Sequence, residues 1–136
     1  MGLVSFSKYF YHKSSCATNW LYQMVSLETG EAPNIGSNDG SRLLQITDIP
    51  FIDYRASIQL AMAVFQNKKA YPNHALSNQH LEWLGIQQGE DEPLAYCNCE
   101  FLDGGYTILR YESVSAVFRF PQFHFRPCQA DALHID

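Results

Sequence analysis

The sequence has little basic charge. Nine Lys and Arg residues are scattered along 136 positions, against fourteen Asp and Glu, and the formal net charge is −5. Nucleic-acid surfaces need clustered Lys and Arg that neutralise phosphates. The composition therefore argues against a nucleic-acid partner, and it gives no support for capturing a polyanion through bulk charge.

Long hydrophobic runs are also missing. No stretch reaches the roughly 18 apolar residues that a membrane-spanning helix needs, and the start, Met1 to Ser7, has no basic segment followed by an apolar core of signal-peptide length. We therefore expect no membrane partner and no export signal of this chain's own, which makes the cytoplasm the default location. A longer parent protein in the periplasm or cell envelope stays open.

Cysteines are too few and too unevenly spaced for a disulfide framework: Cys16, Cys97, Cys99 and Cys128. Cys97 and Cys99 could form a zinc cluster with Cys128, His124 and His134. However, structural zinc sites favour about two to four residues between the first two ligands, and here there is one. We expect buried free thiols that behave as small hydrophobes, with a small metal-binding domain as an alternative.

The apolar content is ample for a core, at 46% of residues with 14% aromatic, and the length suits one ordinary domain. An acidic, proline-terminated segment at 90–93 separates a helical part, residues 1–90, from a strand-rich part, residues 91–136. The change of period predicts an α+β fold.

Apolar residues at roughly helical spacing predict the first helix: Trp20, Leu21, Met24, Val25 and Leu27. Thr18 or Asn19 would cap it and Gly30 would end it. Its apolar face is expected to join the core.

A second helix is predicted from Tyr54 to about Gln66, capped by Asp53. Its apolar positions are Ile58, Ala61, Met62 and Phe65, with Leu60 and Val64 widening the face, which indicates burial against several neighbours. A short helix from Ser77 to Leu84 follows, with Ser77 as its cap, Leu81 and Leu84 inward, and Gly85 at its end.

Beyond the acidic segment, β-branched and aromatic residues predict paired antiparallel strands at 106–111 and 115–120. Turns are expected at 103–105 and 112–113. Residues 130–136 alternate polar and apolar side chains like a half-buried strand and end without a turn residue. We expect that the sequence stops inside an element and that a site there is present only in part.

Several motifs together resemble the heparinase II/III-like polysaccharide lyases. They are the loop at 29–40, which reads Thr-Gly-Glu-Ala-Pro-Asn-Ile-Gly-Ser-Asn-Asp-Gly, the Asp-Tyr-Arg at 53–55, the Gly-Gly-Tyr strand at 104–110, and the Gln-Ala-Asp-x-Leu-His segment at 129–134. The resemblance implies helices from the end of an (α/α) toroid over residues 1–90. It implies the first antiparallel strands of a truncated β-sandwich over residues 91–136.

The family likeness also implies an activity. Such lyases cleave uronate-containing acidic polysaccharides by β-elimination, and the resemblance allows a divalent metal such as zinc in the sandwich domain. The toroid segment that carries the family's catalytic tyrosine has no counterpart here, so we expect the chain to be inactive alone. A non-catalytic carbohydrate-binding or assembly module is the alternative, and exposed apolar faces of an incomplete fold predict self-association.

At the motif where the family has a His-Ala-Asp-like sequence, this chain has Gln129, Ala130 and Asp131. An amide can hydrogen-bond a substrate carboxylate but cannot act as a base. His134, the nearest imidazole, is therefore the candidate catalytic residue, and the alternative is a strand histidine that pairs with Asp131 or Asp136 for structural support. Arg126 is a candidate for holding a carboxylate, either of the substrate or of Asp131.

In the 29–40 loop, Asn34, Asn38 and Asp39 lie among glycines, a pattern that fits sugar contact or a structural Asx-turn loop. Arg55 is expected to pair with Asp39 and attach this loop to the second helix. Tyr54 and Tyr106 do not lie where the family has its catalytic tyrosine, so we interpret both as packing residues.

Overall fold

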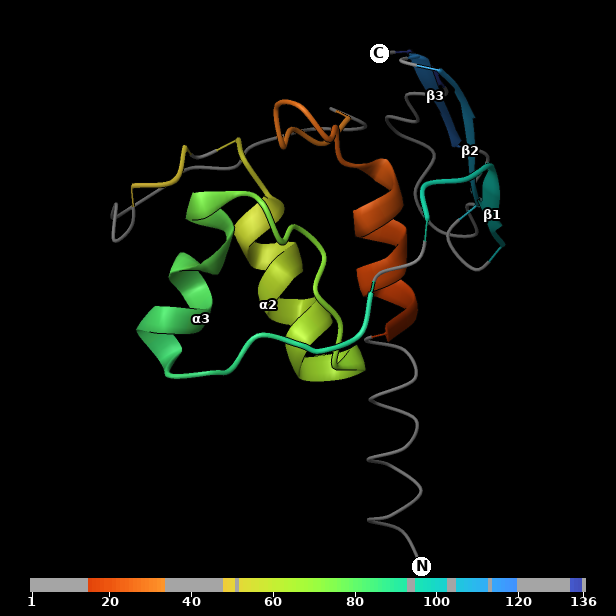
Figure 1. Cartoon of the computed structure of the whole chain (residues 1–136). Coiled ribbons are helices and arrows are strands. Elements are labelled where there is room, and N and C mark those ends of the chain that lie inside the picture. Colours follow the sequence, from red (N-terminus) through yellow and green to blue (C-terminus); the bar gives the residue numbers. More distant parts are fainter. Residues whose placement is uncertain are drawn as a thin grey trace, which may run out of the picture.

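The computed structural model describes residues 15–33, 48–50, 52–92, 95–102, 105–112 and 114–119, together with the backbone of 133–135. Helices lie on one side and an antiparallel sheet on the other, with the helix formed by residues 15–24 between them (Figure 1). The α+β class is confirmed. Among the described residues, no helix is long and apolar enough to cross a membrane.

The helix over residues 15–24 is the first predicted helix, but its predicted ends are wrong. Thr18 and Asn19 lie inside it and so cannot cap it, and it stops at Met24. A separate turn follows, in which the Gly30 N–H donates to the Ser26 carbonyl at 3.0 Å. Gly30 has a φ of +78°, which favours glycine, so it closes this turn and not the helix itself.

The second helix, α2 (Arg55–Gln66), forms as predicted. Asp53 Oδ1 accepts the backbone N–H of Arg55 at 3.0 Å, so the carboxylate serves the start of the helix while Tyr54 occupies the N-cap position. Asn67 ends the helix in the left-handed conformation with a φ of 55°. Ile58, Ala56, Gln59 and Met62 are buried, whereas Val64 is 43% exposed, so the wide apolar face is only partly covered.

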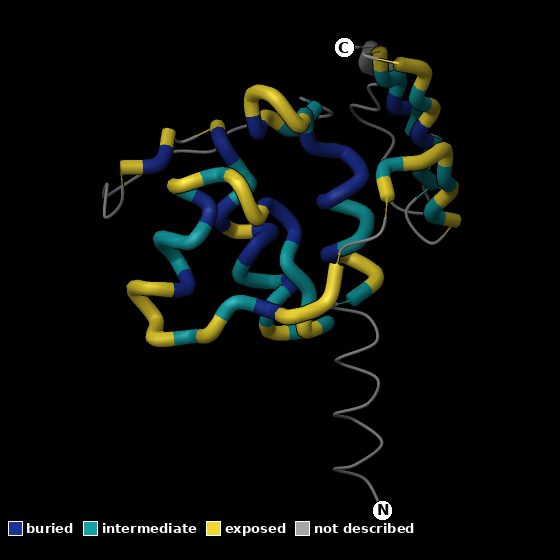
Figure 2. The backbone as a smooth tube through the Cα atoms, viewed as in Figure 1, coloured by how far each residue is buried: buried dark blue, intermediate teal, exposed yellow. Residues whose placement is uncertain are grey.

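The third predicted helix is divided into the 3-10 turn η1 (Ala75–Asn78) and α3 (Gln79–Leu84). Ser77 is not a helix cap: it is buried, and its hydroxyl donates to the carbonyls of Tyr71 and His74 at 3.0 and 2.7 Å. Leu81 is buried as predicted, but Leu84 is 50% exposed because the last turn of the six-residue α3 extends beyond the core (Figure 2). Gly85 ends the helix as predicted, with a φ of 65°.

The start of the acidic segment is bonded to the end of α2. The Lys69 N–H donates to the Asp91 carbonyl at 2.8 Å, and the Glu90 and Asp91 N–H groups both donate to the Asn67 carbonyl at 3.0 Å. Gly89 lies so close to the Lys68 backbone that a Cβ there would collide with it. These backbone contacts fix the chain where it leaves the helical part.

Four strands form one antiparallel sheet in the order β1 (Cys99–Phe101), β2 (Tyr106–Tyr111), β3 (Val114–Arg119) and β4 (Leu133–Ile135). The β2–β3 pair confirms the two predicted strands, and β4 falls within the predicted C-terminal strand. The three-residue strand β1 was not predicted, because it is too short to show a period of two.

Within the described residues, the core consists of two clusters that share the helix over residues 15–24. One cluster joins this helix to α2: Tyr22, Val25, Ile58, Met62, Ala70 and Tyr71. The other joins it to the sheet: Met24, Ile108 and Val117, with Trp20, Cys99, Phe101 and Tyr106 against them. Tyr54 and Tyr106 pack against these clusters, as predicted. The helix is thus covered on two sides (Figure 2).

Candidate functional site

Most of the predicted site residues lie outside the described residues: Asn34, Asn38, Asp39, Arg126, Gln129 and Asp131. The structure places the other two, Arg55 on α2 and the backbone of His134 in β4.

His134 pairs with β3, where its Cα partner is Val117. Val117 is 1% exposed and belongs to the cluster that contacts the helix over residues 15–24. His134, the candidate catalytic residue, therefore lies in β4, next to β3, and β3 contacts the helix through Val117.

The Arg55 guanidinium connects α2 to the turn at 26–30. Its Nε donates to Asp53 Oδ1 at 2.9 Å and its Nη2 to Asp53 Oδ2 at 2.7 Å, a two-point ion pair. Nη1 donates to the Glu28 carbonyl at 3.1 Å, and Nη2 also donates to the Thr29 carbonyl at 3.3 Å. With its three nitrogens engaged, Arg55 supports the backbone and is not poised to hold a substrate carboxylate.

The same contacts explain the protonation of the pair. Burial alone would raise the pKa of the Asp53 carboxyl, but the hydrogen bonds and charge of Arg55 outweigh burial and hold that pKa below its usual value. The hydrogen bonds to Asp53 raise the pKa of Arg55 in turn. Both groups are therefore charged at neutral pH.

A pocket of about 270 Å³ opens beside this pair, lined by Leu27, Arg55, Ala70, Tyr71, Pro72, Asn73 and His74. Among the described residues, the buried Nδ1 of His74 has no hydrogen-bond partner.

Three tyrosines meet between the helix over residues 15–24 and the chain leading to β1. The rings of Tyr22 and Tyr96 lie 4.5 Å apart, and the hydroxyls of Tyr71 and Tyr96 lie 3.4 Å apart. The Arg110 guanidinium carbon lies 4.5 Å from the centre of the Tyr96 ring. Burial raises the pKa of all three hydroxyls, so they are neutral and do not serve as bases at neutral pH.

The prediction of buried thiols is wrong for Cys16 and Cys97, whereas Cys99 meets it in part because it packs against the sheet cluster. Cys16 and Cys97 are exposed, and Cys99 is half-buried where β1 begins. Burial, followed by the neighbouring Cys97, raises the pKa of Cys99 to about 11. In the part of the chain that the structure describes, no three His, Cys, Asp or Glu side chains are grouped as ligands for a metal ion.

Gln23 and Arg110 connect the helix to the sheet, and sequence reasoning missed both. Gln23 is buried; its Nε2 donates to the Ala95 carbonyl at 3.0 Å and its Oε1 accepts the Cys97 N–H at 3.2 Å. The Arg110 guanidinium donates to the Gln23 carbonyl. The available signal was a polar Gln within a run of apolar helix residues, which requires partners when it is buried.

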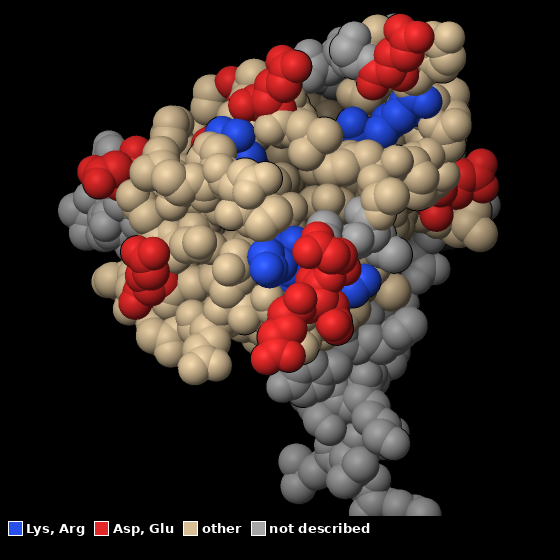
Figure 3. All heavy atoms as spheres, in the orientation of Figure 1, with Lys and Arg blue, Asp and Glu red and all other residues tan. Residues whose placement is uncertain are grey.

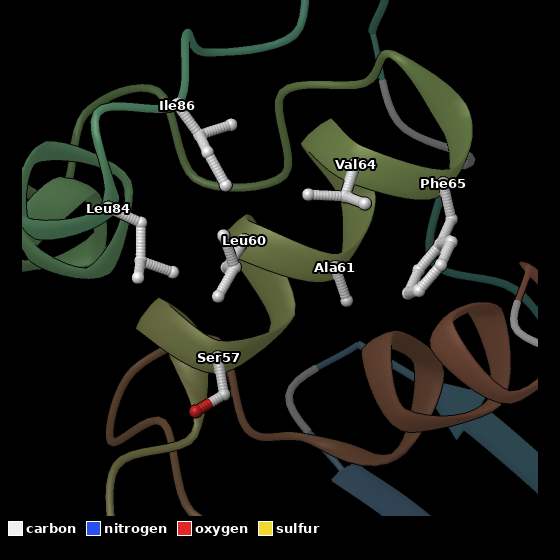
Figure 4. Close-up of a pocket in the computed structure, with 7 residues that line it drawn as sticks. All are labelled: Ser57, Leu60, Ala61, Val64, Phe65, Leu84 and Ile86. Atoms are coloured by element: carbon white, nitrogen blue, oxygen red, sulfur yellow. The ribbon is translucent and has the colours of Figure 1, made fainter.

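An apolar groove runs along the outer side of α2, lined by Ser57, Leu60, Ala61, Val64, Phe65, Leu84 and Ile86. We call it the α2 groove. Leu84 and Ile86 lie across from Leu60, and none of the described residues that line the groove is ionisable (Figure 4). By contrast, acidic and basic side chains are dispersed over the face shown in Figure 3, without a concentrated basic area.

The sequence matches no family model. The comparisons with curated proteins and with solved structures also found no match.

Proposed function

We propose that the chain is a piece of a heparinase II/III-like polysaccharide lyase, at the junction of its helical and β parts, and that it contacts an acidic polysaccharide. Two features support this proposal: the sequence motifs, and the position of His134 in the sheet that packs against the helix over residues 15–24. The second feature carries it, because a lyase of this type binds its glycan between the two parts.

β-Elimination sets the chemistry required. A base removes the C5 proton of the uronate, and the electron pair of the broken C5–H bond forms the C4–C5 double bond. The C4–oxygen bond breaks at the same time, as an acid protonates the leaving oxygen. Neutralising the uronate carboxylate makes the C5 proton more acidic. In this proposal His134 transfers a proton, Gln129 and Arg126 contact the carboxylate, and Asn34, Asn38 and Asp39 contact the sugar chain.

The chain alone lacks the toroid tyrosine, so it should bind without turnover. Mixed with alginate or heparan sulfate, it should produce no rise in the ultraviolet absorbance of unsaturated uronate. It should bind these polymers more tightly than a neutral glucan, and His134→Ala should weaken that binding. His80→Ala is the matched control, since His80 lies on α3, away from the sheet (Figure 1).

Two outcomes would contradict the proposal. Appreciable turnover by the purified chain would contradict an incomplete catalytic set. Equal affinity for neutral and acidic glycans, unchanged by His134→Ala, would contradict polysaccharide recognition at this junction.

A second candidate, an assembly module, is favoured by the α2 groove. The chain carries a net charge of −5, so two copies repel each other overall, but the lining of this groove, as far as the structure describes it, carries no charge. Val64 and Leu84 are 43% and 50% exposed there. We infer that the occupant is a second copy of the chain, which brings an equally uncharged apolar groove.

A further inference from the structure

Two of the three described thiols are close neighbours. Cys97 and Cys99 are separated by one residue and interact electrostatically, whereas Cys16 lies on the helix over residues 15–24. Cys97 is exposed and Cys99 is half-buried. The pair thus combines one sulfur open to solvent with one held against the sheet cluster.

We propose that Cys97 and Cys99 form a two-sulfur site for a soft monovalent metal ion, Cu(I) or an ion of the same chemistry. This proposal does not depend on a role in polysaccharide binding. It differs from the zinc cluster considered from the sequence, because it uses two thiolates and no histidine.

The backbone that carries the two thiols is held on both sides. The Cys97 N–H donates to Gln23 Oε1 at 3.2 Å, and Asn98 Oδ1 accepts the Arg110 backbone N–H at 2.6 Å. Cys99 then enters β1, where its Cα partner is Ile108. These contacts hold the backbone that carries both thiols, so less order has to be gained when the two sulfurs bind one ion.

A disulfide between the two thiols is disfavoured by the same contacts. Asn98 and Cys99 are held against β2, and two residues of extended chain span about 6.6 Å between Cα atoms. That distance lies near the upper end of the roughly 4.4–6.8 Å that a disulfide tolerates. Closing the disulfide would pull the backbone away from Gln23 and Arg110. An ion bound between the two sulfurs lets them stay further apart, so the backbone can keep these contacts.

The donor set selects the ion. Thiolates prefer Cu(I), zinc and iron–sulfur clusters, but zinc requires about four ligands. In the described parts of the chain, no third His, Cys, Asp or Glu joins the pair. A monovalent ion of filled d shell is satisfied by two thiolates, and its binding releases two protons without oxidation or reduction. The complex carries one negative charge, and the Arg110 guanidinium, which acts electrostatically on Cys99, offsets it.

The test is an anaerobic titration of the reduced chain with Cu(I) against a chromophoric Cu(I) chelator, with the stoichiometry read by native mass spectrometry. One ion per chain is expected. Cys97→Ser and Cys99→Ser should each weaken binding by more than about tenfold, since even partners outside the ligand set change metal affinity by that factor. Cys16→Ser and Cys128→Ser should leave the affinity unchanged, and thermal melting without metal verifies that each variant folds.

Three results would overturn the proposal. The first is failure of the wild-type chain to compete with the chelator. The second is an affinity that survives loss of either Cys97 or Cys99. The third is an equal loss in Cys128→Ser, which would indicate a three-thiol site.

Discussion

Gly30 has a φ of +78° and lies against the Asp53–Arg55 pair, where an added Cβ would collide with the Asp53 carboxylate and come within 2.6 Å of Arg55 Nε. Gly85 has a similar φ of +65°, but no atom lies within 4 Å of the Cβ position. The two glycines therefore separate the cost of the backbone conformation from the cost of displacing an ion pair.

We expect Gly85→Ala to lower the free energy of unfolding by about 1 to 2 kcal/mol, the cost of a left-handed L-residue. Gly30→Ala should lower the free energy of unfolding by this amount and by about 2 to 3 kcal/mol more, because it also breaks hydrogen bonds between charged groups. Urea denaturation of both variants measures the difference. Equal losses would mean that the ion pair moves aside freely and does not support the turn.

Asp53 also predicts a dependence of stability on pH. Its pKa is lower in the folded chain than the value of about 3.9 in an unfolded one, so its contribution is fully present above that value. The contribution is lost as the pH falls through the folded pKa. We expect Asp53→Asn to be less stable than the wild type at neutral pH, and the gap to close in acid.

The measurement is the urea midpoint of wild type and of Asp53→Asn, from neutral pH down to a pH below the folded pKa of Asp53. Asp48→Asn serves as the control, since Asp48 is an exposed carboxylate with no ion pair among the described contacts. A gap that stays constant down to acid pH would show that Asp53 acts through shape and not through charge.

At the scale of elements, the helix over residues 15–24 joins the sheet through Gln23. Replacing this side chain by the similarly shaped Met leaves the Ala95 carbonyl and the Cys97 N–H without their partner, which should cost about 1 to 2 kcal/mol. Faster amide hydrogen exchange at residues 95–99 would locate the loss. As a control, Gln87→Met, at an exposed position, should change neither the free energy of unfolding nor the exchange at residues 95–99. Unchanged exchange in Gln23→Met would contradict the link between the helix and the sheet.

Elements with a strong period were predictable from the sequence. α2 and the β2–β3 pair follow from their spacing of apolar residues, and Asn67 and Gly85 end their helices as left-handed residues should. The caps assigned to Thr18 and Ser77 failed for a different reason. A hydroxyl residue resembles a cap in sequence, yet Ser77 bonds to two carbonyls of the preceding turn and Thr18 is buried inside a helix.

The candidate site was less predictable than the fold. Arg55 was identified as a supporting residue, but its contacts with Asp53 and with the carbonyls of residues 27–29 depend on how the turn folds back onto α2, which no local pattern encodes. The Gln23–Arg110 link joins residues 87 positions apart. Local spacing predicts elements, whereas such contacts arise only when the elements pack.

On the scale of the whole molecule, the helix over residues 15–24 contributes to both core clusters, and no described element covers the outer side of α2. Trp83, next to the α2 groove in sequence, is 66% exposed. A standard protein interface buries about 800 Å² on each partner. The α2 groove is lined by seven residues, against roughly 20–30 residues a side in such an interface, so we expect a weak dimer that forms with increasing concentration.

Sedimentation at rising concentration should show this dimer, and Trp83 fluorescence should shift to shorter wavelength as the indole leaves water. Val64→Glu should abolish both changes, because it places a charge in an apolar contact between two acidic chains. Leu109→Glu is the matched control: Leu109 is 46% exposed against 43% for Val64, but it lies on β2. If Leu109→Glu alone dissociates the dimer, the sheet and not the α2 groove forms the contact; a monomer at every concentration would contradict self-association altogether.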